Sequence, residues 1–357
     1  MGGRPATGSM LQRSLRYLGL TLVFLAIAWG ARLTFLEGFV ESRPRGFAGD
    51  FTAITFGHDW WNGRGIVYGP VFVVESWFVA WWPRLFTPEF FAVANAFLAG
   101  GAFVFGAKAC RADRWVILAS LAAWLCYWRL FYAFSVAANP EFLELFLLSW
   151  AWFAASRGRE RTEGAMVAMA GLTKLVPWVF LVPLALRRSV RALTGVLMAA
   201  VPIVLVVAIG QKMSPAETLL RLVLPTNGRP LPTGPTASSG QFQGVGEALA
   251  RLVYGAGEHA LTPGQSQSVL ILFAGIVLAA LGLAVWASIR LLRRGASVEP
   301  GWTFVYPLYF ALLPVLSVQA HPHTFLFLLP VWIALLDQLS KDQGDARLRA
   351  VFGACFA

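Results

Sequence analysis

Asp50 is the first residue whose type and setting suit catalysis. It lies in Gly46-Phe47-Ala48-Gly49-Asp50-Phe51, inside a polar stretch at 37–66 that follows an apolar run. A carboxylate flanked by apolar residues beside a membrane is partly desolvated, which raises its basicity and suits it to take a proton from a hydroxyl. A solvated turn aspartate or a helix cap is the alternative interpretation.

The same stretch contains His58, Asp59, Trp60 and Trp61. An aromatic face can stack on a sugar ring, but the simplest interpretation of the two tryptophans is an aromatic belt at the membrane interface. Tyr68 then leads through a Gly-Pro pair into the next apolar segment. This stretch is therefore a candidate binding loop outside the lipid.

Several ionisable residues lie in or beside apolar runs. Asn139 precedes Glu141, Glu144 follows one turn later, and Arg129 lies in the preceding run. Charged groups at membrane depth are expensive and indicate function by default, although Arg129 could equally form a structural bridge with either glutamate. Lys174 needs an anion or carbonyls to offset desolvation, and a lipid-linked phosphate would serve, unless the side chain snorkels to an interface.

His321 and His323 flank a proline between two apolar runs. Residues at i and i+2 do not share a helix face, so a two-histidine metal site on one helix is not expected. A histidine here can instead hydrogen-bond a phosphate or a sugar hydroxyl. The sequence has no Gly-rich nucleotide loop after a strand, and its three cysteines form no disulfide or metal pattern.

Composition then defines the class of protein that must position these residues. The 357 residues are 57% hydrophobic and 13% charged, about half the charged fraction of an average soluble domain. An ordinary soluble enzyme and a disordered chain are both excluded. The net charge of +11 fits basic cytoplasmic loops and anionic lipid headgroups, so no nucleic-acid partner is expected.

Apolar runs bounded by charges or turn residues predict an all-α polytopic membrane protein with about nine to ten spans. We expect one membrane-embedded domain over 1–340 with external loops at about 37–66 and 212–266, while 341–357 look like the opening of a further helix. Basic residues before the first run place the N-terminus in the cytoplasm. The runs are at about 15–36, 67–86, 89–108, 114–134, 141–156, 163–187, 191–211, 267–292, 302–320 and 322–338.

The run from Gly164 to Leu186 has basic residues on both flanks, so the charge rule draws both of its ends to the cytoplasm. A single span cannot satisfy this. Two half-helices broken at 173–177 can, because Pro177 lacks a backbone donor and restricts the residue before it. Lys174 would then point into a protein-lined cavity. The alternative is one span with a flank that departs from the rule.

Taken in order, these motifs resemble the polyprenol-phosphate-sugar-dependent glycosyltransferases of the GT-C class, and most closely glycosyltransferase family 87, the α-1,2-mannosyltransferases of bacterial envelope synthesis. The similarity covers nearly the whole chain. Its elements are an acidic first external loop from Asp50 to Tyr68-Gly69-Pro70, Asn139 at the start of a later span, a Gly-rich helix running into Lys174-Leu175-Val176-Pro177, a Gln/Ser-type motif at Gln241, and a late histidine element at 321–323.

The resemblance implies a GT-C-type bundle that moves a hexose, mannose in this family, from a polyprenyl-phosphate donor to an envelope glycolipid or glycan. The reaction would occur at the external face of the bacterial plasma membrane, with inversion and with Asp50 as general base. No cofactor is implied and no divalent metal is expected. Together with the residue analysis it assigns Lys174, His321, His323 and Arg129 to the donor phosphate, and His58, Asp59, Trp60, Tyr68, Asn139 and Gln241 to the sugar or acceptor.

Two other hypotheses stay open at this point. A lipid or sugar transporter without covalent chemistry would line its path with Arg129, Glu141, Glu144 and Lys174, although the two halves of the sequence show no repeat. A non-catalytic relative is supported by Gln241, where the family has an Asn-x-Ser element, and by the proline that splits the histidine pair.

Overall fold

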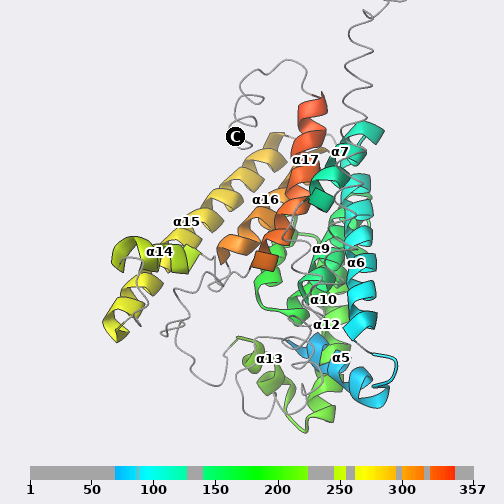
Figure 1. The fold of residues 1–357 in the computed structure, drawn as a ribbon, viewed down its shortest axis with the longest axis vertical. Helices are drawn as coiled ribbons and strands as arrows, with labels where there is room; N and C mark the ends of the chain where they lie inside the picture. Colours follow the sequence, from blue (N-terminus) through cyan, green and yellow to red (C-terminus); the bar gives the residue numbers. More distant parts are fainter. Residues whose placement is uncertain are drawn as a thin grey trace, which may run out of the picture.

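A computed structural model describes residues 69–86, 88–126, 140–223, 245–254, 262–294, 300–316 and 322–341, and every regular element in these ranges is helical. The all-α expectation is confirmed for this part of the chain. The helices are α5 (Pro70–Trp81), α6 (Pro88–Cys110), α7 (Arg114–Cys126), α9 (Pro140–Ser156), α10 (Glu160–Thr173), η2 (Val176–Phe180), α11 (Leu181–Leu186), α12 (Val190–Gly210), α13 (Pro215–Val223), α14 (Val245–Tyr254), α15 (Pro263–Arg294), α16 (Pro300–Leu316), η4 (Pro322–Phe327) and α17 (Leu328–Lys341) (Figure 1).

Within the described ranges, three helical segments are long and apolar enough to cross a membrane: Val93–Cys110 in α6, Val190–Gly210, and Gln267–Leu291 in α15. Helix α5, in the run predicted at 67–86, has 12 residues. At 1.5 Å per residue it is about 18 Å long, short of a hydrocarbon core of about 30 Å. This run is therefore a short helix followed by turns. The first run, 15–36, lies outside the described residues, and the total of nine to ten spans stays a prediction.

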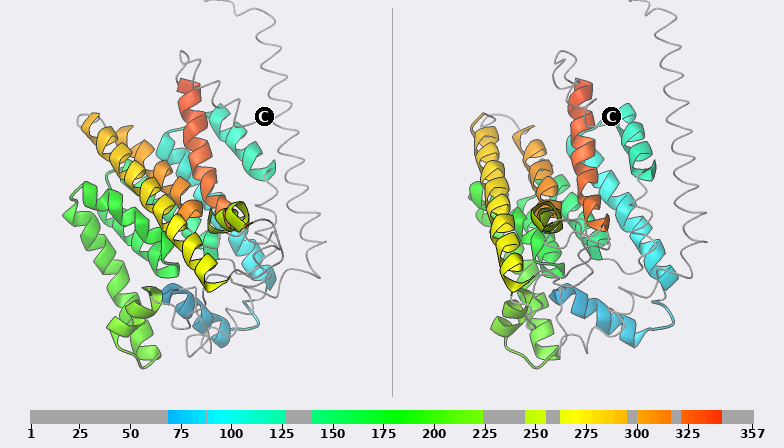
Figure 2. Two further views of the ribbon diagram at one scale, coloured as in Figure 1. Left: turned by 90° about the vertical axis from the view of Figure 1, so that its left-hand side faces the viewer. Right: turned by 60° about the vertical axis from the view of Figure 1, so that its left-hand side comes forward.

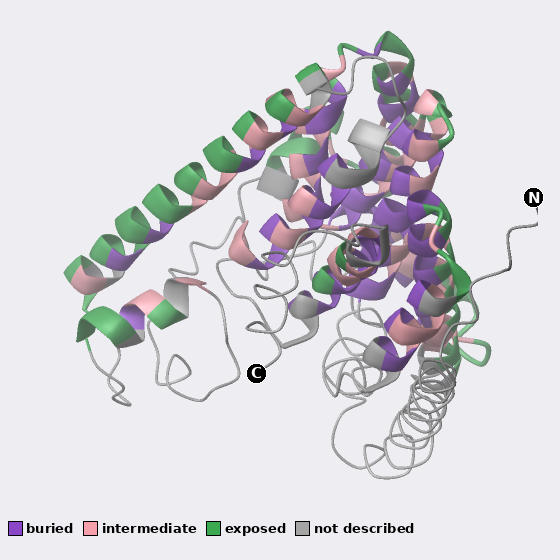
Figure 3. Cartoon of the chain, turned by 90° about the horizontal axis from the view of Figure 1, so that it is seen from above, coloured by how far each residue is buried: buried purple, intermediate pink, exposed green. Residues whose placement is uncertain are grey.

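Apolar side chains cover the outward faces of α12 and α15. Ile209 on α12 is 76% exposed, and Leu278 on α15 is 68% exposed. Figure 3 shows exposed residues running along the side of α15 that faces away from the bundle. Soluble monomers rarely expose an apolar surface of this extent, so these faces identify a protein embedded in lipid.

The run from Gly164 to Leu186 folds back on itself. Helix α10 ends at Thr173, and η2 and α11 return the chain toward the start of α10. Arg187, just after α11, pairs with Glu163 at 2.6 Å and with Glu160 at 3.2 Å, both in the first turn of α10. The two basic flanks therefore lie at the same end, which confirms the predicted pair of half-helices and excludes the single span.

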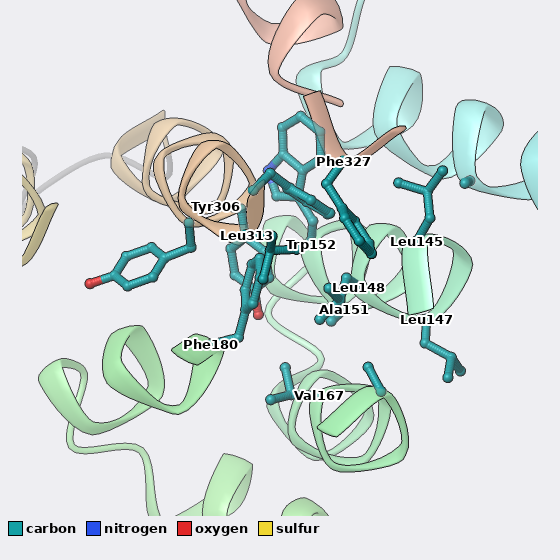
Figure 4. Packing of buried hydrophobic residues seen from close by; sticks show 14 of the residues in the cluster. Leu145, Leu147, Leu148, Ala151, Trp152, Val167, Phe180, Tyr306, Leu313 and Phe327 are labelled. Carbon is teal, nitrogen blue, oxygen red and sulfur yellow. The ribbon is translucent and has the colours of Figure 1, made fainter. Parts of the chain in front are cut away.

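The hairpin made by α10, η2 and α11 is anchored in the core of the bundle. Phe180 of η2 is fully buried and lies 5.4 Å, centroid to centroid, from Tyr306 and 5.2 Å from Phe310, both on α16. Figure 4 shows Phe180 beside α16, with Trp152 of α9 close by. The hydroxyl of Tyr306 donates a hydrogen bond of 2.9 Å to Glu163, so the same aromatic layer also holds the ionic end of the hairpin.

The two ends of the bundle differ in charge. Basic residues gather at the upper end of the bundle in Figure 1. This end is formed by the ends of α6, α9, α15 and α17 and by the starts of α7, α10, α12 and α16. At the lower end, defined by α5, α13 and the ends of α10 and α12, the basic residues are Arg84, Lys174, Lys212 and Arg221. The basic residues at the upper end are Lys108, Arg111, Arg114, Arg157, Arg159, Arg161, Arg187, Arg188, Arg191, Arg290, Arg293, Arg294 and Lys341.

Figure 2 shows the same helices from two further sides, with α10 and α12 running together beside α5. These two helices touch through glycines. A Cβ atom at Gly195 would overlap the backbone of Arg161, and one at Gly164 would overlap the backbone carbonyl of Ala192. Backbone atoms cannot move aside as a side-chain tip can, so the close approach requires glycine at both positions.

We predict that Gly195→Ala lowers the free energy of unfolding by about 1–3 kcal/mol, because overpacking forces the helices apart. Gly282→Ala on α15 is the matched control, since no atom lies within 4 Å of the added Cβ there. Thermal unfolding of both variants in detergent measures the difference. Equal midpoints for the two variants would contradict the close packing of α10 on α12.

Candidate functional site

The break that carries Lys174 has a specific backbone cause. In an α-helix the N–H of residue 177 would donate to the carbonyl of Thr173, but residue 177 is proline and has no N–H. Thr173 instead accepts a hydrogen bond of 2.7 Å from the N–H of Gly69. Lys174 follows in an extended conformation, with φ −142° and ψ 160°. The start of α5 is thereby fixed beside the break.

Lys174 forms an ion pair with Glu141 in the first turn of α9. Its side chain is 18% exposed, and that of Glu141 is 3% exposed. The sequence required an anion or carbonyls to offset the desolvation of Lys174, and within the described structure Glu141 provides the anion. The snorkelling alternative depended on one span over 163–187, which the fold does not form.

Two further carboxylates adjoin this pair. Glu144, one turn along α9, is 2% exposed and lies within electrostatic range of Lys174, Glu141 and Glu75. Its Oε1 atom accepts no hydrogen bond from any residue that the structure describes. The lower end of the bundle thus holds Glu75, Glu141, Glu144 and Lys174, a cluster that we call the Lys174 cluster.

A cavity of about 400 Å³ opens beside the Lys174 cluster, between α5, α6 and α9. Glu75 belongs to the Lys174 cluster and also lines the cavity. Pro140, the residue before Glu141, forms part of the cavity wall. The rest of the lining is apolar, half of it phenylalanine, with Asn95 as a second polar side chain. The site is therefore a charged cluster next to an apolar, aromatic chamber.

Sequence reasoning found part of this arrangement. The sequence predicts Lys174, Glu141 and Glu144 as ionisable residues beside apolar runs, and the structure brings them together. In the sequence, Asn95 is simply a polar residue in an apolar run, and Glu75 is simply an ionisable residue in another apolar run. Neither residue belongs to a motif that would mark it as part of a site. The structure therefore adds these two residues to the site.

Most of the other predicted site residues lie outside the described residues. Tyr68 directly precedes Gly69, and Asn139 directly precedes Pro140, in the sequence. The backbone of His323 belongs to η4, which packs against α9, α16 and α17. The predictions that lie outside are Asp50, His58, Asp59, Trp60, Tyr68, Arg129, Asn139, Gln241 and His321.

Within the described ranges no group of three or more His, Cys, Asp or Glu side chains is placed to hold a metal ion. The chemistry that the Lys174 cluster can supply is that of its own charges: an ammonium that can hold an anion, and carboxylates that can accept hydrogen bonds or a proton.

The fold and the site define a membrane-embedded protein with a charged cluster beside an apolar cavity at one end of its helical bundle. The sequence matches the model of glycosyltransferase family 87 over residues 66–317, which is more than half of the chain, and the protein belongs to this family. It is therefore a glycosyltransferase. No curated protein and no solved structure matches the chain.

The family match contains Lys174, Glu141, Glu144, Glu75 and the whole cavity lining. It also contains Tyr68, Asn139, Arg129 and Gln241 from the predicted set. Asp50, His58, Asp59 and Trp60 precede the matched range, and His321 and His323 follow it. The part of the chain that carries the family pattern is thus the part that builds the Lys174 cluster.

We predict that Lys174→Met lowers the free energy of unfolding by about 3–5 kcal/mol, because it leaves the carboxylate of Glu141 buried without the Lys174 ammonium. The double variant Lys174→Met/Glu141→Gln should recover most of that loss, since it removes both charges. Unfolding in detergent measures each variant, with Lys108→Met as the control at an exposed lysine. A single variant as stable as the control would contradict the buried pair.

Proposed function

We propose that this glycosyltransferase moves a hexose, mannose in the first instance, from a polyprenyl-phosphate donor to a hydroxyl of an envelope glycolipid or glycan. The observation that carries the proposal is the position of Lys174 at the helix break, beside the start of α5. An ammonium has three N–H donors, so Lys174 can bind a phosphate oxygen while it stays paired with Glu141.

The proposed reaction is a single in-line displacement. Asp50 takes the proton of the acceptor hydroxyl as its oxygen attacks the anomeric carbon, and the bond from that carbon to the phosphate oxygen breaks. Polyprenyl phosphate leaves with the electron pair, and the anomeric configuration inverts. Lys174, His321, His323 and Arg129 stabilise the negative charge that develops on the phosphate.

The remaining assignments concern the sugars. Histidine, aspartate and amide side chains can bond sugar hydroxyls, and an indole ring can cover the apolar face of a sugar. We assign this work to the residues that adjoin the lower end or precede it in the chain. They are His58, Asp59, Trp60, Tyr68, Asn139 and Gln241.

The donor is already activated, since its phosphate is the leaving group. The proposed reaction therefore requires no nucleotide and no cofactor, and we expect none, nor a divalent metal. Membership in a transferase family supports this covalent chemistry over the transporter hypothesis.

The charge difference between the two ends supports an orientation. Basic residues at the upper end favour the cytoplasmic side of a bacterial plasma membrane, which would put the Lys174 cluster and the loops at 37–66 and 212–266 at the external face. The N-terminus would lie in the cytoplasm. Donor and acceptor would then meet outside the cell, where nucleotide sugars are absent.

We predict that Asp50→Asn lowers kcat by about 10²–10⁴-fold, because the amide cannot accept the proton of the acceptor hydroxyl. Transfer of radiolabelled mannose from synthetic polyprenyl-phosphate mannose measures kcat, and a binding assay with the same donor should give an unchanged Kd. Asp113→Asn is the matched control, since Asp113 caps α7 at the upper end through the N–H of Val116, at 2.9 Å. Near-normal turnover in Asp50→Asn would remove Asp50 as the base.

The orientation predicts which introduced cysteines an impermeant maleimide reaches in intact cells. Arg84→Cys, in the exposed turn after α5, should be labelled from outside, and Arg159→Cys, before α10, only after permeabilisation. The parent protein with its native cysteines sets the background. Labelling in the reverse order would place the Lys174 cluster on the cytoplasmic side.

A further inference from the structure

We propose that the cavity between α5, α6 and α9 is a binding site for the sugar ring of one of the two substrates, next to the Lys174 cluster. The proposal rests on the proposed glycosyl transfer and deepens it, because it assigns Asn95, Glu75 and Phe91 to recognition of the ring. None of these residues was singled out as a site residue from the sequence.

The cavity has the size and the walls of a small-molecule site. Its volume of about 400 Å³ falls in the range of roughly 300–1,000 Å³ that is usual for ligand pockets. Phe86, Phe90 and Phe91 come from the start of α6 and the turn before it, and Phe78 comes from α5. Aromatic rings offer flat apolar faces against which the C–H face of a sugar can pack.

Asn95 gives the cavity an unmet hydrogen-bonding demand. The residue is 3% exposed and lines the cavity. Its Nδ2 atom donates no hydrogen bond to any residue in the described ranges. A buried amide without a partner costs free energy, so its retention in an apolar helix points to a partner that arrives with a ligand.

Glu75 faces the same cavity from α5 and can only accept hydrogen bonds when it is ionised. Asn95 supplies donors and an acceptor. A ligand that satisfies both must therefore donate and accept, which a hydroxyl does and an isoprenoid chain does not. The combination of these two polar side chains with aromatic walls fits a polyhydroxylated ring better than a hydrocarbon tail.

The cavity also lies where such a ring is needed. Pro140 forms part of its wall, and the next residue, Glu141, holds Lys174. Glu75 in turn lies within electrostatic range of Glu144. A ring bound in the cavity is thus adjacent to the ammonium that we assign to the donor phosphate.

The test uses saturation-transfer NMR on the full protein in lipid nanodiscs, with the methyl α-glycosides of mannose, glucose and galactose as probes. We expect wild type to bind at least one of them and Asn95→Leu to bind it about two- to tenfold more weakly, because one hydrogen bond is lost. Phe91→Leu should also weaken binding. Phe97→Leu is the matched control, since Phe97 lies on the same helix and is 78% exposed.

Asn95→Leu is also expected to fold, since replacing an unpartnered buried amide by an apolar side chain does not lower stability. Thermal unfolding checks this. Steady-state transfer then identifies the source of the ring: a raised KM for the polyprenyl-phosphate sugar assigns the cavity to the donor, and a raised KM for the glycolipid assigns it to the acceptor.

The binding readout separates this proposal from the proposed reaction. Hexoside binding that depends on Asn95, in a protein that transfers no mannose, would refute the reaction and keep the sugar site. The sugar site would be overturned if wild type binds none of the hexosides. It would also be overturned if Asn95→Leu and Phe91→Leu bind them as tightly as Phe97→Leu does. Loss of farnesyl phosphate binding in Phe91→Leu alone would then identify the cavity as a groove for the lipid tail.

Discussion

The hydrogen bond from Gly69 to Thr173 is the interaction on which the site depends. Pro177 offers no N–H to the carbonyl of Thr173, and a carbonyl left unpaired in a membrane costs several kcal/mol, so irregular backbone is tolerated there only where protein surrounds it. The N–H of Gly69 meets this need at 2.7 Å. One proline therefore ends α10, sends the chain back through η2 and α11, and ties the start of α5 to Lys174.

The two ends of the hairpin use charge in different ways. At the upper end, Glu163 accepts from both Arg187 and Tyr306, and Arg187 also reaches Glu160. Such a satisfied network fixes geometry. At the lower end, Glu144 and Asn95 have buried polar atoms that no described residue meets. Unmet polar groups reduce stability, and proteins tolerate them where a substrate supplies the missing partners. The upper end of the hairpin is thus held by paired charges, and the lower end carries the Lys174 cluster.

Lys174 links the family pattern to the architecture. A lone ammonium at this depth is unfavourable, and Glu141 offsets its desolvation without excluding a further anion. The pair forms because α9 begins beside the break, with Glu141 in its first turn. The aromatic cavity shares Pro140 and Glu75 with this region. A phosphate and a sugar ring can therefore lie side by side between α5, α6, α9 and the hairpin, which is the arrangement that a lipid-phosphate-sugar substrate requires.

The sequence by itself determined the helical membrane class, the hairpin break at 173–177 and the need of Lys174 for an anion. These follow from local causes: hydropathy, the missing N–H of Pro177, and the basic residues on both flanks of 164–186, which favour the same side of the membrane. Tertiary structure decided that Glu141 is the anion and that Thr173 pairs with Gly69. It also decided that Glu75 and Asn95 face one cavity. Those contacts join residues distant in the chain, and no local pattern specifies which helices meet or at what register.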